Sequence, residues 1–458
     1  RLAGFLDPYL RKIPAVQKKI EKEYDELLLE MEDSLKPYRK HYESQFALPK
    51  SGKPKKEILK DIRTMFDSEK GRWQKGFVSG GIYHGDSAHI DFLNQVYNLH
   101  SQSNPLHSDI FPSSSKFESE IISMTANMLS KNKAEELDIC GSVTSGGTES
   151  ILLAMKTYRD RARKEKGIKK PEMIAPVTAH TAFDKAADYF KIKLIRTPID
   201  SNFRADVNAV KNAITSNTIV IIGSAPNFPH GIIDPIRELS ELALERKIGF
   251  HTDSCLGGFV LPFAEALGES VPEFDFRLPG VTSMSADTHK FGYAAKGTSV
   301  VLYRGKNLRQ YQYFTVTEWP GGLYFSPTMA GSRPGGLSAA CWAAMISIGE
   351  KGYLDSVKKI LKAAKEIKTG ILAIPELKIL GDPLWIISFA SDEIDIYKVL
   401  DQMSKKGWSL NGLHKPACVH ICTTLRHAQS GVVKRFLKDL KESVRYVKSH
   451  PEEKGGMA

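Results

Sequence analysis

The stretch VTSMSADTHKFGYAAKG, residues 281–297, decides how the rest of the chain is interpreted. Its apolar and β-branched residues predict a buried strand at 281–285, and a loop with Lys290 follows. His289 precedes this lysine, and small or aromatic residues follow it up to Lys296. A lysine near other cations in a partly dry pocket loses its proton more easily and becomes an amine nucleophile. We therefore hypothesise that Lys290 forms a Schiff base with pyridoxal phosphate (PLP).

This hypothesis requires other parts of the chain to bind the cofactor. PLP needs a cradle for its phosphate, an acid for its pyridine nitrogen and a group that stacks on its ring. A glycine-rich turn at 141–150, GSVTSGGTES, opens onto a predicted helix, and such a turn binds phosphate through backbone N–H groups. Thr148 is equally well placed to serve only as the N-cap of that helix.

The composition is that of a globular protein. The chain has 458 residues, of which 41% are hydrophobic and 26% charged. The formal net charge is +11, but the basic residues are dispersed and form no nucleic-acid motif, so we expect no nucleic-acid partner. An anionic substrate or a phospholipid surface fits this charge better. No apolar run approaches the ~18 residues of a membrane span, although a membrane anchor or targeting segment could precede Arg1.

The cysteines predict reduced thiols and a cytoplasmic location. There are five, with wide spacings and no CxxC pair: Cys140, Cys255, Cys341, Cys418 and Cys422. The C-x-H-x-C arrangement centred on His420 resembles a metal site. On a strand, however, its three residues share one face, and no fourth ligand is evident, so we predict buried strand residues and no metal.

The chain divides by pattern into four segments. We predict a helical N-terminal arm at 1–75, a large PLP-binding domain at 76–337, a small C-terminal α+β domain at 338–450 and an unstructured tail at 451–458. The arm has an apolar helical stripe, which is typical of a helix that packs on a partner subunit or covers its own domain.

Strands alternate with helices in the large domain. Short β-like runs occur at 173–178, 193–197, 218–223, 248–253, 281–285 and 298–304. This alternation predicts an α/β protein with a mostly parallel sheet, in which ligands bind beyond the carboxyl ends of the strands. His180, Asp253 and Lys290 follow or end such strands. Asp253 alone could be a helix cap, but beside PLP its carboxylate would pair with the pyridinium N–H, and the imidazole of His180 would stack on the ring.

Two regions outside the alternating strands also matter. Residues 306–336 are rich in aromatic and turn residues, so we predict no regular element there but an active-site or subunit-interface loop. The sequence at 338–450 predicts a compact α+β unit. Its expected helices lie at 338–350, 355–372, 393–406 and 431–448, and its expected strands at 377–380, 384–390, 408–410 and 419–424.

Six motifs occur in an order that carries a family resemblance. They are TSGGTES, APVTAHTAFDKAA, GSAPNFPHG, HTDSCLGG, SADTHKFGYAAKGTSV and SPTMAGSRPGG. Together they resemble sphingosine-1-phosphate lyases, within the fold-type I, group II decarboxylase-like PLP enzymes. The resemblance runs from about Gly80 to Arg333 and is weaker to the C-terminus. It implies an aspartate-aminotransferase-like fold with a mostly parallel seven-stranded sheet and a smaller C-terminal α+β domain.

The resemblance also implies roles for individual residues. Lys290 would hold PLP, Asp253 would bind the pyridine nitrogen and His180 would stack on the ring. The cofactor phosphate would be held by Gly147, Thr148, His289 and, from the neighbouring subunit of a homodimer with shared sites, Ser332. The substrate phosphate would be held by Tyr83, His107 and Lys296. Phe228 stands where some bacterial members have a tyrosine and others have Phe, which puts a hydroxyl-dependent step in doubt but not the activity.

The implied reaction is a retro-aldol cleavage of phosphorylated sphingoid bases at the C2–C3 bond, which gives a long-chain aldehyde and phosphoethanolamine. A base removes the proton of the 3-hydroxyl, and freed Lys290 or a nearby histidine is the candidate proton carrier. Aromatic residues at 311–325 are candidates to line the mouth of an alkyl-chain channel.

Two rival functions are considered. An amino-acid decarboxylase on the same fold would need an arginine or equivalent for the substrate carboxylate, whereas Tyr83, His107 and Lys296 favour phosphate. A PLP-free scaffold or lipid-binding protein is disfavoured because all the expected cofactor groups are present. The product, a long-chain aldehyde or CO₂, separates the lyase from the decarboxylase.

Overall fold

The computed structural model describes residues 13–35, 37–39 and 41–452. Most of the tail expected at 451–458 lies outside these residues. The chain divides between Ser68 and Glu69 into two compact units. The N-terminal unit contains α2 (Pro14–Leu35) and the first part of α3 (Lys55–Gln74). Among the described residues, no helix combines the length and apolar content needed to cross a bilayer.

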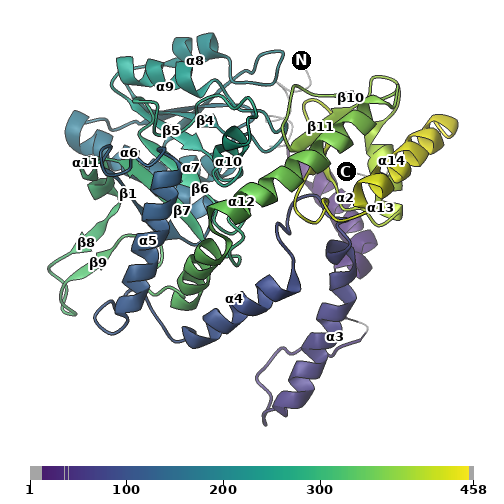
Figure 1. The fold of residues 1–458 in the computed structure, drawn as a ribbon, viewed down its shortest axis with the longest axis horizontal. Coiled ribbons are helices and arrows are strands. Elements are labelled where there is room, and N and C mark those ends of the chain that lie inside the picture. The colour runs from purple at the N-terminus through teal and green to yellow at the C-terminus, as the bar shows by residue number, and fades with distance from the viewer. Residues whose placement is uncertain (1–12, 36, 40, 453–458) are drawn as a thin grey trace. The chain divides into compact units, whose positions relative to one another are not determined.

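A seven-stranded sheet forms the centre of the second unit (Figure 1). Its strand order is β1-β7-β6-β5-β4-β2-β3, and β7 alone runs antiparallel to its neighbours, so the predicted mostly parallel sheet is confirmed. The strands are β1 (Ile139–Thr144), β2 (Glu172–Pro176), β3 (Lys193–Thr197), β4 (Thr218–Ser224), β5 (Gly249–Asp253), β6 (Ser283–Ala286) and β7 (Ser299–Arg304).

Helices cover both faces of this sheet because its strands are apolar on both faces. Along β4, Val220 packs into one core cluster and Ile221 into the other, and along β7 Val301 and Leu302 are divided in the same way. The covering helices are α5 (Pro112–Met128), α6 (Gly147–Lys166), α7 (Ala182–Phe190), α8 (Val207–Ala213), α9 (Ile236–Glu245) and α10 (Leu261–Ala266). Helix α4 (Ser87–Leu99) packs on the long helix α12 (Gly335–Leu372).

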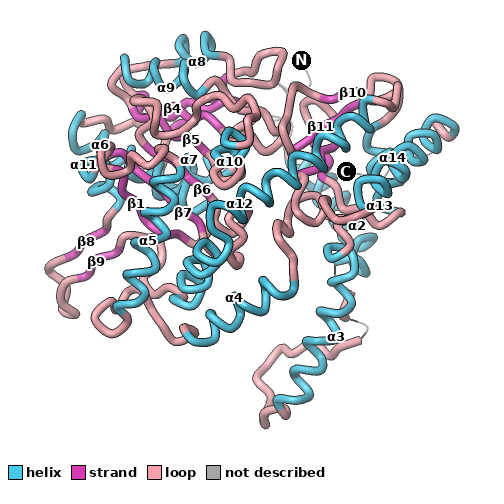
Figure 2. The backbone as a smooth tube through the Cα atoms, in the orientation of Figure 1, coloured by secondary structure: helices cyan, strands magenta, loops and turns pink. Residues whose placement is uncertain are grey.

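The C-terminal part forms a four-stranded antiparallel sheet with helices against it (Figure 2). The strand order is β10-β11-β13-β12, with β10 (Lys378–Ile379), β11 (Ile386–Ala390), β12 (Asn411–Leu413) and β13 (Cys418–Cys422). The helices are α12 (Gly335–Leu372), α13 (Ile396–Lys405) and α14 (Val432–Ser449). The predicted α+β character of this region is confirmed, and the C-x-H-x-C motif lies in buried strand β13, as expected.

The two helices expected at 338–350 and 355–372 are both present. They run together as α12 and are separated by a kink at Gly349, whose φ of 60° is a conformation open to glycine. The structure corrects other element predictions. The strand expected at 408–410 lies instead at Asn411–Leu413, where it pairs with β13. Trp408 precedes it and packs against Phe77 and Phe436. Strand β1 was not among the predicted runs, since its sequence, ICGSVT, contains glycine and serine.

Residues 306–336 also contain regular structure, contrary to prediction. Helix α11 (Lys306–Arg309) and a 3₁₀ turn (Gln310–Gln312) lead into a two-stranded hairpin of β8 (Phe314–Val316) and β9 (Tyr324–Ser326). The alternating aromatic residues of YQYF and LYF supply the β-propensity, and Trp319-Pro-Gly-Gly322 provides the connection.

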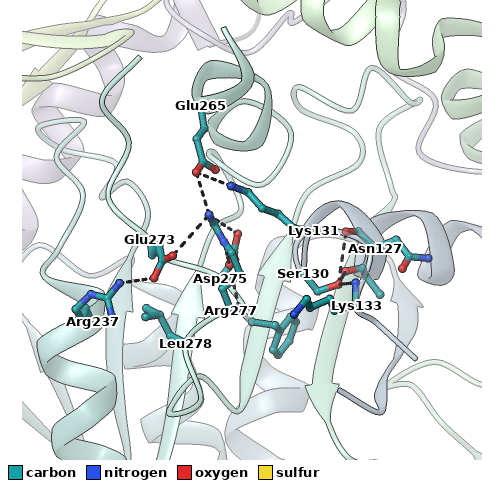
Figure 3. Close-up of polar contacts among 12 residues, drawn as sticks. Asn127, Ser130, Lys131, Lys133, Arg237, Glu265, Glu273, Asp275, Arg277 and Leu278 are labelled. Atoms are coloured by element: carbon teal, nitrogen blue, oxygen red, sulfur yellow. Dashed lines mark hydrogen bonds and ion pairs between the residues drawn. The ribbon is translucent and has the colours of Figure 1, made fainter. Parts of the chain in front are cut away.

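A charged network ties the segment before β6 to the helices (Figure 3). Arg277 donates to Asp275 from Nε at 2.7 Å and Nη2 at 2.9 Å, and to Glu265 of α10 from Nη1 at 2.9 Å. Lys131, just beyond α5, also pairs with Glu265 at 2.8 Å. Glu273 pairs with Arg237 of α9. This set of six residues is called the Arg277 network below.

Candidate active site

A cavity of about 480 Å³ opens at the carboxyl ends of the parallel strands. This is where ligands bind in open α/β sheets. Seven of the predicted site residues line it, namely Tyr83, Gly147, Thr148, His180, Asp253, His289 and Lys290. The cavity therefore brings together residues as far apart in the chain as Tyr83 and Lys290.

Lys290 lies in the loop that follows β6, and its amine is held by a carboxylate. Nζ of Lys290 is 2.8 Å from Oδ2 of Asp287, whose side chain is only 2% exposed. Asp287 raises the pKa of Lys290 against the opposing effect of burial. Without a bound cofactor, Lys290 is therefore an ammonium paired with a buried anion.

The first turn of α6, which is the predicted phosphate cradle, faces the same cavity. Gly147 and Thr148 open this helix, where N–H groups lack intrahelical acceptors and the helix dipole favours an anion. The carboxylate of Glu149 shapes the turn, because it accepts from the N–H of Ser145 at 2.6 Å and of Met329 at 2.9 Å. Its negative charge is thereby engaged by backbone donors.

Asp253 ends strand β5 and is nearly buried, with 7% exposure. Its Oδ1 accepts from the N–H of Cys255 at 3.1 Å and from the hydroxyl of Ser285 at 3.3 Å. These two bonds fix the orientation of the carboxylate at the strand end. The placement is that required of an acid that pairs with a pyridine nitrogen.

His180 lies on the cavity wall just before α7. Its Nδ1 accepts from the N–H of Ala182 at 3.0 Å, so the ring proton resides on Nε2. Phe228 lines the cavity near it and is 39% exposed. Phe228 also packs edge-on against His420 of β13, with ring centroids 4.7 Å apart.

Tyr83 and Lys296 form the second polar side of the site. Nζ of Lys296 lies over the Tyr83 ring, 4.5 Å from its centroid, which is a cation–π contact. Partial burial and the nearby charge of Lys290 lower the pKa of Lys296 to about 8. Burial raises the pKa of Tyr83, so its hydroxyl stays protonated and can donate a hydrogen bond.

His107 and Ser332 are not brought into this cavity. Both are exposed, and neither of these two described residues is among the lining side chains. Their loops lie next to each other instead, because the N–H of Arg333 donates to Asn104 at 3.1 Å and that of Gly335 donates to Ser103 at 2.8 Å. These two predicted phosphate ligands therefore occupy adjacent loops, and Lys296 is likewise not among the residues that line the cavity.

Cys255, Asp287 and Glu149 are among the further lining residues that were not predicted from the sequence. Asp287 stands three residues before Lys290, a spacing that was visible in the quoted stretch. Glu149 and Cys255 gave no comparable signal, since their contacts depend on the folded loops.

The cavity fits PLP. It combines a lysine amine, a carboxylate at a strand end, an imidazole on one wall and a helix N-terminus for phosphate. The cradle also has no room for a larger residue, because a Cβ on Gly147 would lie 2.8 Å from the Asp287 carboxylate oxygens and from Sγ of Cys255.

Comparison with known proteins places the fold and site in the class of pyridoxal-dependent decarboxylases. Residues 37–385 match the model of the pyridoxal-dependent decarboxylase conserved domain. The solved glutamate decarboxylase of Lactobacillus brevis superposes with a TM-score of 0.76 over 89% of this chain and 96% of its own, at 19% identity, which shows the shared fold alone.

Closer relatives define the family. A sphingosine-1-phosphate lyase of Arabidopsis thaliana is 49% identical, over 98% of this chain and 82% of its own length, and sphingosine-1-phosphate lyase 1 of Rattus norvegicus is 45% identical over 97% and 78%. The solved sphingosine-1-phosphate lyase of Burkholderia pseudomallei has a TM-score of 0.88 at 44% identity, covering 91% of this chain and 96% of its own. The chain belongs to the sphingosine-1-phosphate lyase family.

Proposed function

We propose that this protein uses PLP to cleave phosphorylated sphingoid bases at the C2–C3 bond, giving a long-chain aldehyde and phosphoethanolamine. The observation that carries the proposal is a cavity that suits the cofactor, with a second cation held next to one of its lining residues. Lys290, Asp253 and the α6 turn line the cavity and suit the cofactor. Lys296 lies over the ring of the lining residue Tyr83 and suits a second phosphate. The names of the relatives agree with this substrate.

The chain's own residues would share the work as follows. Lys290 holds the cofactor through its amine, and Asp253 pairs with the ring nitrogen. His180 covers one ring face, while Gly147 and Thr148 bind the cofactor phosphate through backbone N–H groups. PLP, when bound, accepts the electrons of the bond that breaks. Lys296 and Tyr83 bind the substrate phosphate, which keeps the C2–C3 bond positioned over the ring.

His107 and Ser332 would complete a partner's site in a homodimer. Both are exposed and lie in loops joined by the Asn104 and Ser103 hydrogen bonds. One shared surface could therefore present both side chains to the cavity of a second copy. His289 would stay with its own cavity, where its Nδ1 donates to the carbonyl of Thr298.

The β8–β9 hairpin is the proposed entrance for the alkyl chain. Its apolar side chains are unusually exposed, with Phe314 at 55%, Trp319 at 54% and Leu323 at 70%. Such a surface favours contact with a long hydrocarbon chain or a lipid surface. The net charge of +11 would help to recruit an anionic lipid. All five cysteines are free thiols, which supports a reducing, cytoplasmic environment.

A cleavage assay with a phosphorylated sphingoid base tests the proposal. The wild type should release aldehyde and phosphoethanolamine in equal amounts. Lys290→Ala should lower turnover by about a thousandfold or more. Lys296→Ala should raise KM by about ten- to a hundredfold with a smaller change in kcat, because it removes a charge-assisted hydrogen bond.

Lys434→Ala, at an exposed position on α14, is the matched control and should behave as the wild type. If the wild type binds PLP but releases CO₂ from amino acids and no aldehyde, the decarboxylase alternative replaces the lyase. If Lys296→Ala changes kcat alone, its assignment to the substrate phosphate is wrong.

A further inference from the structure

Asp287 is a second buried carboxylate of the cavity, and the proposed function gives it no role. It follows β6 directly, and its side chain is 2% exposed. Oδ2 lies 2.8 Å from Nζ of Lys290, whereas Oδ1 has no hydrogen-bond partner in the described part of the chain. The nearest cation, Lys290, therefore balances most of this buried charge.

The other neighbours of Asp287 cover its carboxylate, whereas the side chain of Lys290 is 23% exposed. The backbone of Gly147 covers the carboxylate so closely that a Cβ there would lie 2.8 Å from both oxygens. Nε2 of His289 is 3.8 Å from Oδ2. Cys255 and Tyr83 also face the pair, but burial raises the pKa of both, so they remain neutral. Lys296 is a further cation near Lys290, whose charge lowers the pKa of Lys296.

We propose that Asp287 is a positioning residue that keeps the amine of Lys290 protonated whenever that amine is free, and that Lys290 is therefore the acid of the cleavage and not its base. The inference rests on the proposed function for the reaction, but the ion pair itself is a property of the protein without substrate.

His289, the histidine next to Asp287, is a poorer proton donor. Nδ1 of His289 contacts the carbonyl of Thr298, and a carbonyl accepts only, so Nδ1 carries the proton of the neutral ring. Burial lowers the pKa of His289, which leaves Nε2 as an acceptor without a proton. Among the groups around Asp287, the Lys290 ammonium has a proton to give.

The protons balance under this assignment. When the substrate amine replaces Lys290 on the cofactor, the proton of the substrate ammonium passes to Lys290. The C2–C3 bond then breaks, and the base that took the 3-hydroxyl proton keeps it. Lys290 gives its proton to carbon 2, becomes a neutral amine and can bond to the cofactor again. The proton held by the base leaves on the product ammonium.

The first test measures the amine of Lys290 in the PLP-free protein. An amine reagent modifies only the unprotonated form, and mass spectrometry reports the modification of Lys290 as a function of pH. At pH 8, Asp287→Asn should react about tenfold faster or more, since each pKa unit changes the free amine tenfold. An unchanged rate of Lys290 modification would overturn the proposal.

Two controls keep this test specific. The Lys351–Asp355 pair is similar in distance, 2.9 Å, but its side chains are 91% and 54% exposed. Asp355→Asn should therefore leave Lys351 modification unchanged. The buried thiols of Cys341 and Cys422 should stay protected in Asp287→Asn, which separates a real change at Lys290 from unfolding.

The second test follows one turnover of the loaded enzyme. In the wild type, aldehyde and phosphoethanolamine should appear together. In Asp287→Asn, aldehyde should appear first and phosphoethanolamine should lag, because proton transfer to carbon 2 follows bond cleavage. Equal slowing of both products would exclude the acid role. If the wild type forms no aldehyde, the lyase proposal fails, and the labelling test still decides whether Asp287 controls Lys290.

Discussion

The Asp287–Lys290 pair and the Arg277 network are both charged clusters of the same large sheet, but they are built differently. In the network, Arg277 donates three side-chain hydrogen bonds to Asp275 and Glu265, and Glu265 is shared with Lys131. In the cavity, Asp287 has one oxygen without a hydrogen-bond partner in the described structure. The network is fully paired, whereas the cavity pair is incomplete.

The difference reflects what each cation can do. An arginine cannot lose its proton in a protein, so its burial requires permanent partners. A lysine can become neutral, so its pairing can be broken and restored. The network has an arginine at its centre, whereas the cavity pair has a lysine, whose proton we propose to move during the reaction. Each prediction below tests this contrast by removing one charge or by changing pH.

The largest expected effect follows from Asp275→Asn. Asp275 is 2% exposed and Arg277 12% exposed, so the substitution leaves a buried guanidinium without its main counter-ion. Loss of one member of a buried pair costs about 3–5 kcal/mol in the free energy of unfolding. Urea unfolding at pH 6 to 9 should show this loss with little dependence on pH, because arginine stays charged throughout.

Asp287→Asn is the matched comparison for that experiment. In this variant Lys290 can lose its proton, and burial then favours its neutral form in the folded state. Its destabilisation should therefore be smaller and should shrink as pH rises toward the unfolded lysine value of about 10.4. If both variants lose the same free energy at every pH, the contrast between arginine and lysine is wrong.

A buried histidine without a charged hydrogen-bond partner should have an intermediate effect. His251 contacts the hydroxyls of Ser283 and Ser285 at 2.8 and 3.3 Å, and burial lowers its pKa to about 4. The unfolded histidine titrates near 6.5. Because the folded value is lower, its stabilising contribution is present above about pH 6.5 and is lost as pH falls toward 4.

The loss from His251 alone is about 3 kcal/mol across that interval. His251→Asn should flatten the fall of unfolding free energy between pH 6.5 and 4, at some cost at neutral pH. His414→Asn, at an exposed position, should leave this fall of the unfolding free energy unchanged. If the free energy of unfolding of His251→Asn falls with pH in parallel with that of the wild type, another group causes the acid sensitivity.

The sequence predicted the parallel sheet well because periodic apolar strands report directly on burial. Lys193–Thr197 was predicted at its observed bounds, and Asp253 was placed at the end of its strand. The hairpin at 314–326 was missed because turn residues dominate its composition, although the flanking aromatic residues pair across it. Strand β1 was missed because its pairing with β7, and not its own residues, makes it a strand.

For the site, the sequence supplied residue types but not contacts. The cavity contains Lys290, Asp253 and Tyr83 as expected, whereas the closeness of Asp287 to Gly147 depends on two segments that are 140 positions apart in the sequence. The adjacency of the His107 and Ser332 loops also arises only from the folded backbone. The roles of these residues remain predictions.

The smallest expected effect lies at the rim of the Arg277 network. Lys131 is 58% exposed, so water can replace most of its interaction with Glu265, which keeps Arg277 as a partner at 2.9 Å. Lys131→Ala should change the free energy of unfolding by less than about 1 kcal/mol. Within this one network, Asp275→Asn should therefore lose much more free energy of unfolding than Lys131→Ala. Both variants are measured in the same urea series. A large loss for Lys131→Ala would mean that pairing itself, and not the burial of a permanent charge, stabilises the network.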